Sequence, residues 1–332
     1  MSEILQVISL TKHFKSSVGI VHAVDDISFS IEEGKTIGLV GESGSGKSTT
    51  GHMIAGIYSP TRGKIIFDGV DISVDANKRP LSVKKKIGMV FQDPSTSLNP
   101  RQTIEDIISL PLKVHMRITN YAEMRRTVRG LLEKVQLPAD FMNRYPRDLG
   151  GGERQLVAIA RALASEPTLI ILDEPTSALD VSVQAKIITT LLKLQKEMGL
   201  TYIFITHDLS LMRNVADKVA IMYLGKIYEM ADTQNFFEEP LHPYTMMLIS
   251  SIPTLTDEEE KIKPRGIESL GEIPSAVNPP KGCRFHTRCP FAREECKTNE
   301  PKGEKIDGGR IVFCHFWREI KYKLTTNAPE KI

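Results

Sequence analysis

The residues best suited to bind phosphate form the segment Gly41-Glu42-Ser43-Gly44-Ser45-Gly46-Lys47-Ser48-Thr49, which fits the pattern G-x-x-x-x-G-K-[ST]. Its glycines let backbone N–H groups turn inward around a β-phosphate, beside the N-terminus of a following helix that favours negative charge. Lys47 supplies a mobile positive charge for the β- and γ-phosphates, and Ser48 offers a hydroxyl to Mg²⁺. We therefore expect this segment to bind a nucleoside triphosphate.

Two adjacent carboxylates, Asp173 and Glu174, follow the apolar run Leu169–Leu172. Because successive side chains of a strand point to opposite faces, the two acids are expected to have different roles. Asp173 can hold Mg²⁺ through water, while Glu174 can orient and polarise the water that attacks the γ-phosphate. The pair predicts that the bound nucleotide is hydrolysed.

The cysteines form a third candidate site. All 4 lie in one short stretch, with the spacing Cys283-x5-Cys289-x6-Cys296-x17-Cys314. Since no secretory signal is evident, we expect a reducing compartment, in which a metal site is favoured over disulfides. Four thiolates suit either zinc or a [4Fe–4S] cluster. The close C-x2–4-C pair of structural zinc sites is missing, but the spacing alone leaves open the cluster, zinc with His286 and His315 as further donors, and free thiols or disulfides.

The elements that must position these residues alternate between strands and helices. Ile37–Val40 leads directly into the glycine-rich loop, and a helical pattern follows from Lys47 to about Ile57. Further apolar runs predict a helix at Val181–Met198 and strands at Ile87–Phe91, Leu169–Leu172, Tyr202–Thr206 and Val219–Met222. This alternation indicates an α/β fold with a mostly parallel sheet covered on both faces.

Two further segments complete the predicted organisation. A helical subdomain, about residues 94–165, is expected to be inserted within one α/β domain that spans residues 1–255. Its apolar positions recur at helical spacing, at Met124, Val128, Leu131, Leu132 and Val135. Residues 256–332 carry the four cysteines, several prolines and a charged run, which predict a separate small extension with little regular structure.

Composition restricts the functional class. With 41% hydrophobic and 25% charged residues, the chain has the balance of an ordinary globular protein. A net charge of +2 provides no global field that would attract nucleic acid or acidic lipid. The first residues lack the pattern of a signal peptide, and aliphatic runs such as Leu169–Leu172 are far shorter than the roughly 20 residues that span a bilayer. Any role at a membrane is therefore expected to be exercised from outside the bilayer.

Besides the phosphate loop, five ordered motifs resemble those of the ATP-binding cassette (ABC) family. They are the signature at Leu149, Gly150, Gly151, Gly152 and Glu153; the acid pair running into the D-loop at Ser177, Ala178, Leu179 and Asp180; the Q-loop at Gln92; the switch histidine at His207; and an adenine-stacking aromatic at Phe14. The resemblance covers roughly residues 4 to 252. It implies a P-loop (RecA-like) ABC ATPase core with a helical signature subdomain.

The resemblance also implies a role for each residue. Glu174, His207 and Gln92 would be catalytic, with His207 donating a hydrogen bond to the γ-phosphate and helping to fix Glu174. Gln92 would join Ser48 and Asp173 around Mg²⁺. In ABC dimers the signature acts on the ATP held by the opposite subunit, so Leu149–Glu153 would complete the partner's site.

The signature departs from the family pattern at one position. ABC signatures normally begin Leu-Ser-Gly-Gly, whereas this chain has Gly150 in place of the serine. A glycine keeps its backbone N–H but offers no hydroxyl to the γ-phosphate. A hydrogen bond to a charged group is worth roughly 1.5–3 kcal/mol. We therefore expect the site completed by this signature to be weakened but not abolished.

Further segments resemble the ATPases of oligopeptide and dipeptide importers, most closely the second ATPase subunit. They are Phe91–Pro100, Leu179–Gln184, Met222–Lys226, His242–Thr245, Ser251–Pro253 and Gly282–Pro290. The resemblance implies a peripheral protein at the cytoplasmic face of the cell membrane. Its partners would be two integral-membrane permease subunits, a second related ATPase subunit and, indirectly, an extracellular solute-binding protein. A homodimer remains an alternative to the pair of different ATPase subunits, and no nucleic-acid partner is expected.

Three questions remain after this resemblance: the solute, the functional class and the group held by the cysteines. The same subfamily serves nickel and some oligosaccharide importers, so the solute is not fixed by this chain. A soluble ABC ATPase that acts on ribosomes or DNA is the rival from another class. It is disfavoured because such proteins usually carry two cassettes or a long coiled-coil insertion. For the cysteines, the family likeness favours a [4Fe–4S] cluster over zinc.

Overall fold

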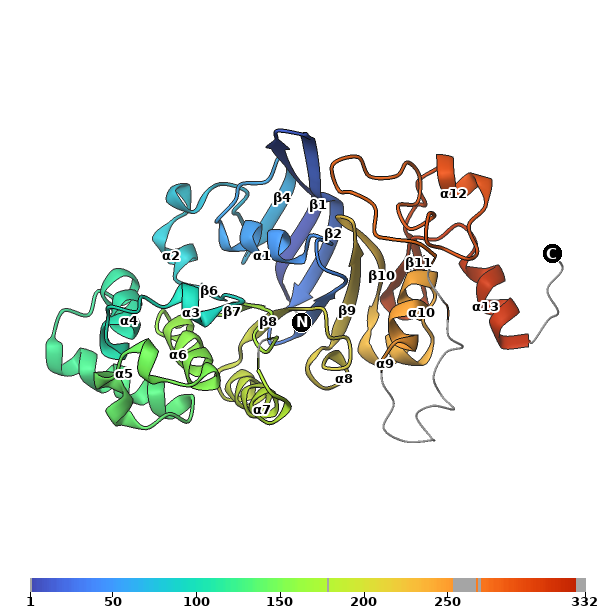
Figure 1. The fold of residues 1–332 in the computed structure, drawn as a ribbon. Helices are drawn as coiled ribbons and strands as arrows, with labels where there is room; N and C mark the ends of the chain where they lie inside the picture. Colours follow the sequence, from blue (N-terminus) through green and yellow to red (C-terminus); the bar gives the residue numbers. More distant parts are fainter. Residues whose placement is uncertain (1, 178, 253–266, 268–269, 327–332) are drawn as a thin grey trace.

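The structure, a computed structural model, describes residues 2–177, 179–252, 267 and 270–326. It contains two sheets, and Figure 1 shows the larger one between a helical subdomain and the C-terminal region. The larger sheet has the strand order β11-β12-β10-β9-β3-β8-β7-β6, and the smaller one has the order β2-β1-β4-β5.

Five adjacent strands of the larger sheet are parallel, as the apolar runs predict. They are β6 (Ile87–Val90), β7 (Leu169–Asp173), β8 (Thr201–Thr206), β3 (Thr36–Val40) and β9 (Lys218–Tyr223). Every residue of β3, β7 and β8 is buried, which explains why these strands read as continuous rather than alternating apolar runs. Their carboxyl ends meet at one edge of the sheet, where ligands bind in open α/β folds.

Each face of this sheet packs against a different layer. Ile170 and Leu172 of β7 belong to one core, with α6 (Gly151–Leu163) and α7 (Val181–Met198). Leu169 and Ile171 belong to a second core, with α1 (Lys47–Ala55) and the smaller sheet. This alternation follows from the two-residue period of a strand and confirms the prediction of a sheet covered on both faces.

The helical subdomain lies at one end of the larger sheet (Figure 1). Its elements are α3 (Pro94–Ser97), α4 (Ile104–Pro111), a π-helical turn (Leu112–Met116), α5 (Tyr121–Lys134) and α6. The predicted apolar face is confirmed, because its residues are 7% exposed or less: Met124, Val128, Leu131, Leu132 and Val135. Thr103 caps α4 by accepting a hydrogen bond from the backbone N–H of Asp106 at 3.2 Å.

The smaller sheet is antiparallel, which the sequence patterns do not predict. β1 (Glu3–Ser16) pairs with β2 (Gly19–Glu32) and with β4 (Arg62–Phe67), and β4 pairs with β5 (Val70–Asp71). Register shifts interrupt β1 and β2, and two of their residues, Ser9 and Asp26, have positive φ. These irregularities break the apolar/polar alternation, so only parts of each strand are recognisable from sequence.

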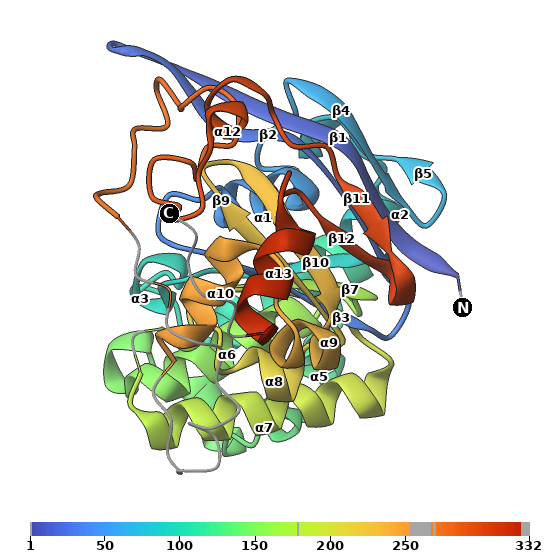
Figure 2. The ribbon, with the colours of Figure 1, turned by 90° about the vertical axis from the view of Figure 1, so that its right-hand side faces the viewer.

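The C-terminal region is less separate than its composition predicts. β12 (Arg310–Val312) pairs with β10 (Lys226–Asp232) of the larger sheet, and β11 (Glu304–Ile306) pairs with β12. Figure 2 shows α10 (Pro243–Ser250), α12 (Glu294–Thr298) and α13 (Trp317–Thr326) on the same side of the molecule. The expected domain boundary at residues 255 and 256 lies outside the described residues, as does Pro253.

The remaining short helices connect these elements: α2 (Leu81–Lys84), α8 (Met212–Val215) and α9 (Thr233–Glu238), together with 3₁₀ turns at Ala76–Lys78, Ala139–Asn143, Pro146–Asp148 and Asp307–Gly309. In the described part of the chain, no helix is both long enough and apolar enough to cross a membrane.

Candidate functional site

The phosphate loop lies between β3 and α1, as predicted. Gly44 and Gly46 have φ values of 77° and 104°, which glycine adopts readily and other residues rarely adopt. A Cβ at Gly46 would lie 2.3 Å from the carbonyl oxygen of Ala23, so a side chain has no room there. The sequence of the loop is thus dictated by backbone geometry as well as by chemistry.

Lys47 is buried at the start of α1. Its Nζ donates hydrogen bonds to the carbonyl oxygens of Gly41 at 2.7 Å and Glu42 at 3.0 Å. Burial lowers the pKa of Lys47, and the nearby carboxylates Glu174 and Asp173 act in the opposite direction. The ammonium group therefore lies among the predicted site residues, held by main-chain oxygens that a phosphate can replace as hydrogen-bond partners.

Two of the predicted magnesium ligands are in contact. Ser48 Oγ donates a hydrogen bond of 2.8 Å to Asp173 Oδ1. Burial raises the pKa of Asp173, while the hydrogen bond from Ser48 opposes this shift. His52, one helical turn after Ser48, has its Nε2 3.7 Å from Asp173 Oδ2. Sequence reasoning missed His52, although its position four residues after Ser48 on a helix is the signal that would find it.

The three predicted catalytic residues meet at the carboxylate of Glu174. Gln92, just after β6, donates from Nε2 to Glu174 Oε2 at 3.1 Å. His207, directly after β8, has its Nδ1 3.2 Å from Glu174 Oε1. Glu174 itself follows β7 and has a φ of 45°, a conformation that costs free energy in a residue with a side chain. The three side chains therefore meet at the ends of β6, β7 and β8, although Gln92 and Glu174 are 82 positions apart in the sequence.

The signature residues lie at the N-terminus of α6. Gly150 is the N-cap residue, and its backbone N–H donates to Glu153 Oε2 at 2.8 Å. Gly151 and Gly152 pack so closely that added Cβ atoms would lie 3.0 Å from Leu179 Cδ2 and 2.3 Å from Val183 Cγ1. Throughout the described residues, no hydrogen bond joins 149–153 to the phosphate loop, 41–49.

The D-loop leads from Glu174 into α7. Asp180 caps this helix, because its Oδ1 accepts a hydrogen bond of 3.0 Å from the backbone N–H of Val183. Ser177 Oγ donates to the carbonyl oxygen of Glu174 at 3.3 Å. The predicted D-loop residue Ala178 lies outside the described residues.

Phe14 lies on β1 beside an aromatic residue that sequence reasoning missed. Its ring meets the ring of Tyr58 edge to face, with centroids 5.2 Å apart. The ammonium of Lys12 lies 5.1 Å from the centroid of Phe14 and 5.6 Å from that of Tyr58. Tyr58 in turn contacts His52, at 5.6 Å between centroids. A row of rings therefore runs from the predicted adenine position towards Asp173.

All four cysteines line a single cavity, together with His286 and His315. All four are free thiols, so no disulfide joins them. Burial raises the pKa of Cys283 and Cys314 to about 12 and that of Cys289 to about 11, so in the absence of a metal these thiols are protonated at neutral pH. The backbone N–H of Cys283 donates to the carbonyl oxygen of Cys296 at 2.9 Å, which holds two of the cysteine segments side by side.

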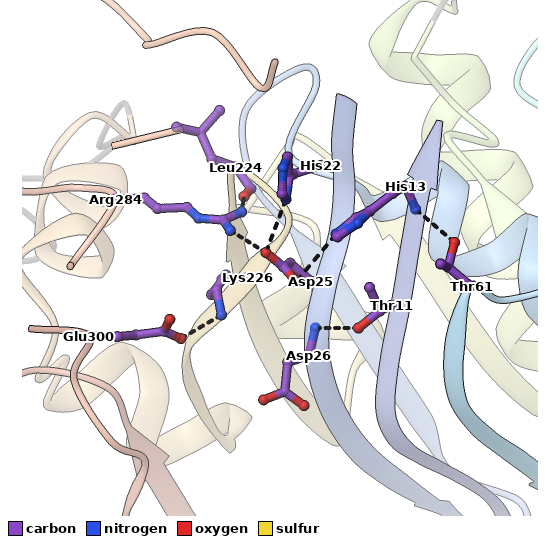
Figure 3. Close-up of polar contacts among 10 residues, drawn as sticks. All are labelled: Thr11, His13, His22, Asp25, Asp26, Thr61, Leu224, Lys226, Arg284 and Glu300. Atoms are coloured by element: carbon purple, nitrogen blue, oxygen red, sulfur yellow. Dashed lines mark hydrogen bonds and ion pairs between the residues drawn. The ribbon is translucent and has the colours of Figure 1, made fainter. Parts of the chain in front are cut away.

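Elsewhere in the part of the chain that the structure describes, one other group of potential metal ligands comes together. The ligand atoms of His13, His22 and Asp25 lie within 4.8 Å of one another (Figure 3). Burial raises the pKa of Asp25, but a hydrogen bond from Arg284 and the charge of Lys226 outweigh that effect, so the net shift is downward. Because these cations already neutralise Asp25, we interpret the group as an ion network rather than a metal site.

Comparison with known proteins identifies two family regions in the chain. Residues 24–177 match the family described as ABC transporter, and residues 228–296 match the family described as oligopeptide/dipeptide transporter, C-terminal region. The chain is 45% identical over 321 residues to the putative oligopeptide transport ATP-binding protein YkfD of Bacillus subtilis, covering 96% of this chain and 97% of that protein. It is also 48% identical to the oligopeptide transport ATP-binding protein AppF of Bacillus subtilis, covering 92% of each chain.

The chain is also similar to a more distant relative and to solved structures of ATP-binding cassettes. The dipeptide transport ATP-binding protein DppF of Haemophilus influenzae is 41% identical, over 94% of this chain and 96% of that one. The dimeric ATP-binding cassette MJ0796, solved in a post-hydrolysis state with ADP and Pi, superposes with a TM-score of 0.63 at 32% identity, covering 69% of this chain and 98% of that one. CbiO1 from Clostridium perfringens, part of the cbiONQ transporter complex, superposes with a TM-score of 0.63 at 30% identity, over 72% of this chain and 92% of that one.

Proposed function

The chain belongs to the ATP-binding subunits of oligopeptide and dipeptide ABC transporters, which hydrolyse ATP to power peptide import, and we propose which of its residues bind ATP and which hydrolyse it. Its partners include permease subunits in the membrane, so it is a membrane-associated protein. The observation that carries the proposal is the junction of Gln92 and His207 on the carboxylate of Glu174.

We assign nucleotide binding to the phosphate loop and Lys47, with Phe14 stacking on adenine. Ser48, Asp173 and Gln92 would hold Mg²⁺, which prefers oxygen ligands. The hydrogen bond between Ser48 and Asp173 supports this assignment, because it shows that the two ligand oxygens are close enough to contact one ion. When bound, Mg²⁺ neutralises the charge of the β- and γ-phosphates.

Glu174 is assigned as the residue that accepts the proton of the attacking water. Its carboxylate is half-buried, and contacts on both oxygens fix its direction. His207 is exposed beside it, where its ring can turn towards a γ-phosphate and leave Glu174 in place. Hydrolysis would therefore depend on the proton acceptor Glu174, and ATP binding on Lys47.

We further propose that the protein works as half of an ATPase dimer under two permease subunits, at the cytoplasmic face of the membrane. A second, related ATPase subunit is the proposed partner, with a homodimer as the alternative, and an extracellular binding protein delivers the solute. Gly150, the N-cap residue of α6, is exposed, which supports the idea that Leu149–Glu153 acts on a nucleotide of the other subunit. Gln92 and the following segment, to Pro100, would transmit nucleotide state to the permeases.

For the cysteines we propose a [4Fe–4S] cluster held by Cys283, Cys289, Cys296 and Cys314. The proposal is supported by the common cavity that all four cysteines line, because soft sulfur donors suit iron–sulfur clusters. When bound, a cluster would cross-link the four segments that carry the cysteines.

The assignment of Glu174 is tested by Glu174→Gln in the assembled transporter. ATP binding should persist, because Lys47 and the loop are unchanged, while the hydrolysis rate should fall by about 10²- to 10⁴-fold. Lys47→Ala is the contrasting variant and should weaken ATP binding itself. Equilibrium binding and steady-state hydrolysis separate the two effects. Near-normal hydrolysis by Glu174→Gln would show that another residue accepts the proton.

A further inference from the structure

Two arginines next to the cysteines reach back into the ATPase core. Arg288 precedes Cys289, and its guanidinium donates two hydrogen bonds to Glu42 of the phosphate loop, at 2.7 Å to Oε2 and 3.1 Å to Oε1. Arg284 follows Cys283 and donates to Asp25 and to the carbonyl oxygen of Leu224 (Figure 3). The cysteine-bearing region is thus hydrogen-bonded to the phosphate loop, the proposed ATP site.

Glu42 is held by three different groups. Its carboxylate accepts from Arg288, its backbone N–H donates to Tyr244 Oη at 3.2 Å, and its carbonyl oxygen accepts from Lys47 Nζ at 3.0 Å. Tyr244 belongs to α10, which lies beyond the ABC transporter region of the chain. A displacement of Glu42 would therefore move the main-chain atoms that contact the phosphate-binding lysine.

The environment of Arg288 makes this contact strong. Its side chain is only 7% exposed, and its guanidinium lies 5.6 Å from the ring centroid of Tyr223 and 5.8 Å from that of Phe285. Burial lowers the pKa of Arg288, but the hydrogen bonds to Glu42 outweigh it, so the net shift is upward. A two-pronged arginine–carboxylate contact in a place of low solvent access fixes both position and orientation.

The charge of Glu42 gives the contact a functional meaning. Glu42 places a carboxylate inside a loop that must receive the negative phosphates of ATP, where an unneutralised acid would repel the ligand. Arg288 neutralises that acid and holds its carboxylate with two hydrogen bonds. Arg288 and Tyr244 hold the loop from the side of α10 and the cysteine region, while α1 holds it from the other.

We propose that Arg288 is a positioning residue for ATP: it neutralises Glu42 and fixes the phosphate loop, so that the cysteine-bearing region forms part of the nucleotide site. This inference rests on the proposed ATP-binding role of the loop. Loss of the contact raises the KM for ATP and leaves kcat nearly unchanged, because Glu174, Gln92 and His207 are untouched.

The test compares variants of the full chain in the assembled transporter. Arg288→Gln should raise the KM for ATP on the order of tenfold, the size of one charge-assisted contact. Arg288→Lys keeps the charge but loses the two-pronged geometry, and should restore part of the affinity. Arg310→Gln is the matched control, because Arg310 is an equally buried arginine of the C-terminal region that pairs with Glu239 at 3.0 Å instead of the loop. It should lower thermal stability without changing the KM.

A second comparison guards against damage to the cysteine site. Glu42→Gln changes the same contact from the loop side, 246 positions away in sequence. In that background, Arg288→Gln should have a much smaller effect on the KM, because the carboxylate that it holds is gone. Equal effects in both backgrounds, or a KM shift in Arg310→Gln as large as in Arg288→Gln, would overturn the inference. Absence of any ATP binding in the unaltered protein would instead overturn the proposed function.

Discussion

Gly150→Ser restores the hydroxyl that this signature lacks, and the structure shows that it fits. Gly150 has φ −67° and ψ 165°, an extended conformation open to any residue. An added Cβ would meet only Glu153 Oε2, at 3.6 Å, which is ordinary van der Waals contact. The change is therefore expected to leave the local fold intact.

Two effects of the new hydroxyl differ greatly in size. At the N-cap position of α6, the introduced serine would accept a hydrogen bond from the helix, and serine improves on glycine there by only about a few tenths of a kcal/mol. Donation to the charged γ-phosphate of the partner's ATP is worth about 1.5–3 kcal/mol, or roughly 10- to 150-fold in an equilibrium. The substitution should thus tighten ATP-driven dimer closure strongly and change thermal stability little.

The assay measures closure against ATP concentration in the Glu174→Gln background, where hydrolysis is blocked. Gly130→Ser is a suitable control, because Gly130 lies on α5, outside the signature, and a Cβ there meets no atom within 4 Å. An unchanged ATP dependence in Gly150→Ser would refute the idea that the missing hydroxyl weakens the site.

The same reasoning predicts an asymmetric transporter if the partner has an intact signature serine. Turnover should then depend mainly on Glu174 of this chain, whose site is completed by the partner's signature. ATPase rates of complexes with one catalytic glutamate removed at a time test this. Equal losses from the two subunits would rule out the asymmetry.

The remaining predictions concern the cysteines and the effect of acid. Protein purified without oxygen should contain iron and acid-labile sulfide in equal amounts, and Ser in place of Cys283, Cys289, Cys296 or Cys314 should lower both; zinc without sulfide would contradict the cluster. Burial lowers the pKa of His242 to about 3, so the folded protein keeps this side chain neutral. The free energy of unfolding should therefore decrease as the pH falls from 6.5, the usual pKa of histidine, towards 3. The slope is about 1.4 kcal/mol per pH unit, and urea unfolding of His242→Asn, which keeps a cap for α10, should show a smaller loss.

The parallel strands and their motifs could be predicted because their signals are local. A run such as Leu169–Leu172 is apolar throughout because both faces of the sheet are covered, and Asp173 and Glu174 follow it directly. Parallel strands then place such strand-end residues at one edge without further information. This is why Gln92, Glu174 and His207 lie close together in the structure.

Contacts between distant segments could not be predicted in the same way. Nothing near Glu42 in sequence indicates Arg288, and nothing near β10 indicates that residues 310–312 pair with it. The pairing of β1 with β4 also depends on packing over a shared core rather than on a repeating pattern. Tyr58 was missed because a single aromatic residue carries no periodic signal.

The added strands β12 and β11 also determine how the sheet ends. Without them, β10 would present a row of unpaired main-chain donors and acceptors, which invites pairing with a strand of another molecule. The strand that is exposed instead, β11, is only three residues long and carries Glu304 and Lys305. A chain truncated before the cysteines would therefore lose more than these thiols. It would also expose β10, a seven-residue edge strand, and we would expect it to aggregate during expression.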